Sequence, residues 1–167
     1  MKKLLISISC VLSLFQSFAQ EKKSEIPSVN IKTLDGKVFN TSQLNNNGKP
    51  MIIDFWATWC KPCVTELNAI SENYVDWQTE TGVKLVAISI DDARTQASVA
   101  PFVSGKGWGY EVYIDANSDF RRAMNVNNVP HTFLFDGTGK LIAQHNTFAP
   151  GDEDKLYEEI LKISGTK

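Results

Sequence analysis

The alternation of apolar and polar positions along the chain predicts strands and helices in turn. Residues 29–40 alternate around Asp35-Gly36, which is typical of a β-hairpin with a tight turn. Residues 51–56 are a mostly apolar run, as expected for a strand buried on both faces. After Lys61, apolar side chains recur at steps of three and four residues as far as Trp77. That period predicts one face of a helix, which should end near Gly82.

The rest of the chain continues in the same way. A second buried strand is predicted at residues 84–90, and a strand, a helix and a strand in that order imply a right-handed parallel crossover. Further elements are expected as a weak helix at 93–105, a strand at 110–115, a short helix at 117–124 capped by Asn117 or Ser118, two strands around the turn at 136–139, and an amphipathic helix at 152–164.

The first residues have the features of a secretory signal peptide. Lys2 and Lys3 precede an apolar run at 4–15, and Ser17 and Ala19 are the small residues of a cleavage site. We therefore expect a signal peptide at 1–19, a flexible leader at 20–28 and one domain at 29–167, in the periplasm or another extracytoplasmic space. Two alternatives remain open. One is an uncleaved membrane anchor, and the other is lipidation of Cys10, although the usual upstream Leu is missing.

Cleavage would leave about 148 of the 167 residues, enough for one domain with a hydrophobic core. Loss of two lysines would change the formal charge from −2 to about −4, and no basic stripe remains, so we expect no nucleic-acid partner. Cys60 and Cys63 would be the only cysteines left. A chain of this size needs no disulfide scaffold, which favours a chemical role for the pair.

The Cys60-Lys61-Pro62-Cys63 stretch stands where the helix is predicted to begin. Unpaired backbone N–H groups and the helix dipole stabilise an anion there, which lowers the pKa of the first thiol, and Lys61 adds a positive charge. Pro62 suits the first turn. We expect Cys60 to attack a substrate disulfide and Cys63, one turn further on, to resolve the mixed disulfide.

Other uses of the two cysteines fit less well. A structural zinc site needs four ligands, and His131 and His145 are not at zinc-finger spacing from the pair. An inert disulfide that closes so small a loop would stabilise little. A peroxidase cysteine would require Pro and Thr where Ile53 and Ala57 stand. We expect no metal and no cofactor.

Taken together, "MIIDFWATWCKPCVTEL", "GVKLVAISID" and "NNVPHTFLFDGTGKLI" resemble the thioredoxin superfamily, and specifically its exported TlpA/ResA-like thiol-disulfide oxidoreductases. The similarity runs from about residue 26 to 161. The leading hairpin and an inserted segment around 93–113 are also similar to this branch. The resemblance implies an α/β thioredoxin fold, in which a central mixed β-sheet is flanked by helices and extended by an N-terminal β-hairpin.

The resemblance also implies roles for residues around the two cysteines. Asp54 corresponds to the buried acid of thioredoxin, which suits a proton acceptor for Cys63. Glu66 matches an acid typical of the TlpA/ResA branch and would share a helix face with Cys63. The alternatives are a backbone-capping role for Asp54 and a solvated charge for Glu66.

The substrate groove is implied in the same way. Val129-Pro130 matches a loop whose proline is cis and whose backbone pairs with an extended substrate. His131 stands where the family often has Thr, so its positive form could stabilise the Cys60 thiolate, or it could be structural. Trp59 is expected on the groove surface and Trp56 in the core.

These features predict an extracytoplasmic reductase of protein disulfides that acts as a monomer. By resemblance, it would be returned to the dithiol by a DsbD/CcdA-like membrane thiol donor, and apocytochrome c is one candidate client. Two alternatives stay open, a disulfide-forming oxidant and a copper-binding thioredoxin-like module.

Overall fold

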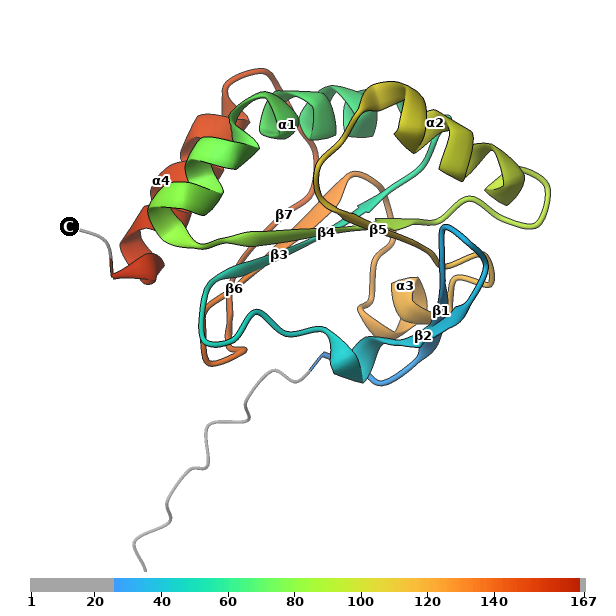
Figure 1. The fold of residues 1–167 in the computed structure, drawn as a ribbon, viewed down its shortest axis with the longest axis horizontal. Coiled ribbons are helices and arrows are strands. Elements are labelled where there is room, and N and C mark those ends of the chain that lie inside the picture. Colours follow the sequence, from blue (N-terminus) through green and yellow to red (C-terminus); the bar gives the residue numbers. More distant parts are fainter. Residues whose placement is uncertain (1–25, 166–167) are drawn as a thin grey trace, which may run out of the picture.

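A seven-stranded mixed β-sheet runs through the molecule in the order β2-β1-β5-β4-β3-β6-β7 (Figure 1). This computed structural model describes residues 26–165. The predicted signal peptide and residues 20–25 of the predicted leader lie outside this part of the chain. Within it, no helix has the length and apolar character needed to cross a membrane.

The centre of the sheet consists of parallel strands with antiparallel additions at both sides. β3 lies parallel to β4, and β4 lies parallel to β5, whereas β6 is antiparallel to β3 and to β7. The β1–β2 hairpin adds to the sheet through an antiparallel pairing with β5. The strands are β1 Asn30–Thr33, β2 Val38–Asn40, β3 Met51–Trp56, β4 Lys84–Ser89, β5 Glu111–Ile114, β6 His131–Phe135 and β7 Leu141–His145.

Helices cover both faces of the sheet. In Figure 1, α1, α2 and α4 lie on one side and α3 on the other. Their bounds, with those of two 3₁₀ turns, are α1 Lys61–Thr81, α2 Val99–Lys106, α3 Asp119–Ala123, α4 Asp152–Ser164, η1 Thr41–Gln43 and η2 Gln96–Ser98. Successive side chains of a strand point to opposite faces. Accordingly, Phe55 of β3 contacts Phe120 of α3, whereas Trp56 contacts Phe102 of α2.

The predicted elements and their order agree with the structure. Met51–Trp56 is buried along its whole length, and α1 ends at Gly82, whose φ of 69° is the left-handed conformation of a helix C-cap. Ser118 is the N-cap residue of α3, one of the two positions predicted, but it makes no side-chain capping bond. The Asp115 carboxylate accepts the Asp119 and Arg121 N–H groups instead, because it lies at the end of β5 directly before this helix.

Candidate active site

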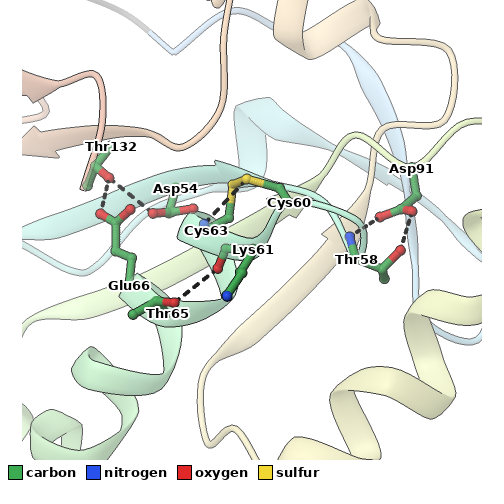
Figure 2. Close-up of a disulfide and its surroundings, with 9 residues drawn as sticks. All are labelled: Asp54, Thr58, Cys60, Lys61, Cys63, Thr65, Glu66, Asp91 and Thr132. Carbon is green, nitrogen blue, oxygen red and sulfur yellow. Dashed lines mark hydrogen bonds between the residues drawn. A yellow bond between two sulfur atoms is a disulfide. The ribbon is translucent and has the colours of Figure 1, made fainter. Parts of the chain in front are cut away.

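Cys60 and Cys63 form a disulfide at the N-terminus of α1, with their Cα atoms 5.3 Å apart (Figure 2). β3 ends at Trp56, and a short loop leads to Cys60, which is the N-cap of α1. The Cys63 N–H donates to Cys60 Sγ at 3.3 Å. Pro62 stands in the first turn, where its missing N–H leaves no intrahelical bond unmade. The sulfur of Cys60 therefore faces the unpaired N–H groups of a helix start, as the sequence predicted.

The two cysteines differ in their access to solvent. Cys60 is 6% exposed, while Cys63 is fully buried beneath it. Because Cys60 is the more exposed of the two, the geometry favours attack of a large partner at Cys60. Cys63 is buried and can react only with the neighbouring Cys60 sulfur.

Thr58 and Asp91 hold the loop that leads to Cys60. Asp91 follows β4 and is fully buried. Its carboxylate accepts the Thr58 N–H at 2.9 Å and the Thr58 hydroxyl at 2.6 Å (Figure 2). It also accepts the Ser89 hydroxyl at 2.7 Å. These bonds tie the loop to the end of the neighbouring parallel strand.

Asp54, Thr132 and Glu66 meet behind the disulfide (Figure 2). The Thr132 hydroxyl lies 3.0 Å from Asp54 Oδ2 and 2.7 Å from Glu66 Oε1. Asp54 and Thr132 are directly opposite each other on the antiparallel strands β3 and β6, so their side chains point to the same face. Glu66 reaches this point from the second turn of α1. All three residues are buried.

Burial determines the electrostatics of the two carboxyls. Loss of hydration and the nearby charge of Glu66 raise the pKa of Asp54 well above its ordinary value, and the Thr132 hydrogen bond lowers it only in part. Burial raises the pKa of Glu66 to about 7, against the lowering effect of Thr132 and of the His145 charge. At neutral pH this pair can therefore hold or accept a proton beside the cysteines.

A polar groove of about 340 Å³ runs beside Val129 and Pro130. The peptide bond between these residues is cis, as the resemblance implied. The groove is lined mainly by amide side chains from the segment before the proline and from the end of β7, namely Asn125, Asn127, Asn128, Gln144 and Asn146. Backbone and amide groups here could pair with an extended peptide.

His131 packs against an aromatic ring and an amide side chain. Its ring stacks on Phe133 and lies 3.3 Å from Gln144 Oε1. Burial lowers its pKa, although the Gln144 contact opposes this. Since side chains alternate along β6, His131 shares a face with Phe133 and Phe55, opposite the face of Thr132. In this disulfide form, burial therefore favours the neutral ring.

Trp56 is fully buried in the core, as the sequence suggested. Trp59 is 62% exposed beside Cys60 but does not line the groove at Val129 and Pro130. Glu66 lines a separate cavity of about 360 Å³ between the end of β7 and α4. Among the described residues, no three His, Cys, Asp or Glu side chains are grouped so that they could hold a metal ion.

Sequence reasoning missed Thr132 and Asp91. Threonine is an ordinary residue in a strand, so the sequence gives no sign that Thr132 belongs to the site. Only the strand register, which places Thr132 opposite Asp54, identifies it. Asp91 directly follows a buried strand, and acids at the ends of parallel strands often gather at one edge of the sheet. That signal was present in "AISIDD".

Comparison with known proteins agrees with this geometry. The model of the AhpC/TSA family matches residues 23–144. The thiol-disulfide oxidoreductase ResA of Bacillus thuringiensis (strain Al Hakam) is 32% identical over 84% of this chain and 82% of its own length. The solution structure of an uncharacterized thioredoxin-like protein from Porphyromonas gingivalis is 46% identical, has a TM-score of 0.75 and is matched over 85% of this chain and 93% of its own.

A second solved structure is similar over nearly its full length. The putative thiol:disulfide interchange protein DsbE from Chlorobium tepidum is 27% identical, with a TM-score of 0.72 over 87% of this chain and 99% of its own. The thioredoxin-like fold and the ResA-like resemblance predicted from the sequence are thus confirmed.

Proposed function

This chain belongs to the AhpC/TSA family and is a thiol-disulfide oxidoreductase, and from that premise we propose that it reduces the disulfides of protein clients in an extracytoplasmic compartment. The observation that carries the proposal is the Cys60–Cys63 disulfide at a helix N-terminus, next to a buried pair of protonatable carboxyls. A peroxidase function does not fit, because Ile53 and Ala57 occupy the positions where a peroxidase cysteine requires Pro and Thr.

The first step is attack by Cys60. In the dithiol form, the Cys60 thiolate attacks one sulfur of a client disulfide, a Cys60–client disulfide forms, and the second client sulfur leaves as a thiolate. The helix start and the greater exposure of Cys60 relative to Cys63 support Cys60 as the attacking group.

The second step is resolution by Cys63. Its thiol gives a proton to the Asp54–Glu66 pair, and the resulting thiolate attacks Cys60 Sγ. The Cys60–Cys63 disulfide forms, and the client's first sulfur leaves as a thiolate. Asp54 is proposed as the proton acceptor, since a base is most effective when its pKa lies near the operating pH, and burial raises the pKa of Asp54 toward that range.

Client binding is proposed to use the surface around Cys60. Trp59 offers an exposed aromatic face, and Val129 and Pro130 offer backbone groups at one end of the polar groove. His131 would take part only as a neutral wall of that groove. An extended client segment could lie across this surface with its disulfide over Cys60.

The proposed location and partners rest on the signal-like N-terminus and on the ResA and DsbE names of its relatives. We propose a monomer that receives electrons from a DsbD/CcdA-like membrane thiol protein, with apocytochrome c as one candidate client.

The direction of exchange is tested by the reduction potential of the Cys60–Cys63 couple, measured by equilibration with glutathione. A reductase should have a potential close to that of thioredoxin, about −270 mV, and an oxidant one close to that of DsbA, about −120 mV. A value near the second figure would contradict the proposal and favour the disulfide-forming alternative.

A further inference from the structure

We propose that the Thr132 hydroxyl relays a proton between Asp54 and Glu66, so that both carboxyls share the proton that Cys63 gives up during resolution. This inference rests on the proposed function, because it assigns a positioning role within the same second step. Thr132 touches neither sulfur in the proposed chemistry and acts through Asp54.

The geometry puts one hydroxyl between two carboxyls. Thr132 Oγ1 lies 3.0 Å from Asp54 Oδ2 and 2.7 Å from Glu66 Oε1, both within hydrogen-bond range (Figure 2). Thr132 is 1% exposed, so bulk water does not compete for these contacts. The cross-strand pairing of β3 and β6 orients the hydroxyl toward Asp54, and α1 brings Glu66 to its other side.

The single Thr132 hydroxyl cannot donate a hydrogen bond to both carboxyls at once. A threonine hydroxyl has one proton to donate, whereas an ionised carboxylate can only accept. If Asp54 and Glu66 were both ionised, one of the two contacts would join two oxygens with no hydrogen between them. One carboxyl must therefore be protonated and donate to Oγ1, while the hydroxyl donates to the other.

The disulfide form of the protein therefore holds a proton on this pair. The disulfide form is also the product of resolution, which is the step in which Cys63 must lose its proton. The structure is consistent with a carboxyl pair that has accepted it.

The relay breaks the S–H bond of Cys63, and every other bond that it changes is an O–H bond. Asp54 accepts the proton from the Cys63 thiol and then donates it to Thr132 Oγ1, while the proton already on Oγ1 passes to Glu66 Oε1. No electrons are transferred, and rotation of the hydroxyl restores its starting orientation. The electron pair that closes the disulfide comes from the Cys63 thiolate, and the departing client thiolate carries the balancing charge.

Glu66 is the end of the relay that lies closer to solvent. It lines the cavity between β7 and α4, whose wall includes His145 Nε2 and Glu159 Oε2, 2.8 Å apart. The titratable groups facing the two carboxyls come from α1, β7, α4 and the residue before β5, namely Cys63, His145, Asp152, Glu153, Lys155, Glu159 and Tyr110. A proton on Glu66 can leave through this cavity.

The test compares Thr132→Val with Thr132→Ser in the full chain. Valine keeps the shape of threonine without the hydroxyl, and serine keeps the hydroxyl. The reduced protein is mixed with the disulfide reagent 5,5′-dithiobis(2-nitrobenzoate). Attack by Cys60 releases a first coloured thiolate, and resolution by Cys63 releases the second, so the two steps appear as two phases.

In Thr132→Val, the second phase should slow about tenfold or more at pH 7, while the first stays within about twofold of wild type. The Thr132 bonds lower the pKa of both carboxyls, so their loss should also move the pH midpoint of the second phase upward. Thr132→Ser should retain the wild-type rate and midpoint.

Two results would overturn the relay. One is a wild-type second phase in Thr132→Val. The other is equal slowing in both variants with an unchanged pH midpoint, because altered packing has that effect. Failure of the proposed function would look different, since the wild-type protein itself would lack the first phase or have an oxidant's potential.

Discussion

The Asp91 carboxylate accepts two hydrogen bonds from Thr58, one from its backbone N–H at 2.9 Å and one from its hydroxyl at 2.6 Å. Thr58 precedes Cys60 by two residues, and Asp91 comes after β4. The approach to the redox disulfide is thus held by a side chain more than thirty positions away in the sequence. Asp91 also pairs with the Ser89 hydroxyl, so it satisfies three donors at a buried point.

Asp91→Ala should therefore destabilise the protein. It would leave the Thr58 and Ser89 donors without their acceptor, at a cost of about 2 to 3 kcal/mol in free energy of unfolding. Guanidinium unfolding of the oxidised protein measures the loss. Asp92→Ala is the matched control, because the neighbouring Asp92 is only partly buried and pairs with the exposed Arg94. An equal loss in both variants would contradict a specific role for Asp91.

The two cysteines should give different products when changed singly. Cys60→Ser should abolish disulfide reduction, whereas Cys63→Ser should accumulate mixed disulfides with clients, because the attacking sulfur remains and the resolving one is gone. Non-reducing electrophoresis followed by mass spectrometry of the adducts detects them. Adducts on Cys63 in Cys60→Ser, with none in Cys63→Ser, would reverse the assignment.

Stability should fall as the pH rises through the pKa of Glu66. Its pKa is about 7 in the folded protein against an ordinary 4.5, so the folded state keeps a proton that the unfolded chain has lost. The protonated Glu66 therefore stabilises the folded state fully below about pH 4.5, and this contribution is lost as the pH rises to about 7. The free energy of unfolding should fall by on the order of 3 kcal/mol over this range.

Glu66→Gln should make this pH dependence less steep, because glutamine does not titrate and only the contribution of Asp54 remains at the pair. Urea unfolding at intervals from pH 4 to 8 gives both curves. The exposed Glu72 on the same helix supplies the control, since Glu72→Gln should keep the wild-type slope. A Glu66→Gln curve as steep as wild type would assign the slope to other groups.

Trp59→Ala should weaken client binding without destabilising the fold, because the side chain is 62% exposed. We expect KM for reduction of insulin to rise about five- to thirtyfold, the effect of losing an aromatic contact worth about 1 to 2 kcal/mol. Turnover of a small disulfide reagent should change little. Val75 is also apolar and 72% exposed but lies in the middle of α1, so Val75→Ala should leave both KM values unchanged.

His131→Thr should leave the pKa of the Cys60 thiol unchanged. The ring contacts Phe133 and Gln144, and burial favours its neutral form, so there is no positive charge to remove. The rate of iodoacetamide alkylation as a function of pH reports the thiol pKa in both proteins. A higher thiol pKa in the variant would show that a charged ring stabilises the thiolate after all.

The sequence by itself determined the local parts of this site. The apolar run at 51–56, the three- and four-residue spacing after Lys61 and the Gly82 stop predicted β3 and α1 with the cysteines at their junction. These features are local, because helix periodicity, N-terminal anion stabilisation and a left-handed glycine cap depend on residues a few positions apart.

Only the tertiary structure decided which distant side chains meet Asp54. In β6, His131 and Thr132 are neighbours, and of these two the sequence indicated only His131 as a candidate, because a titratable ring near a cysteine suggests chemistry. The β3–β6 register pairs Asp54 with Thr132 and turns His131 to the opposite face. A shift of one residue would exchange the two, and that register depends on packing across the whole sheet rather than on the residues beside the site.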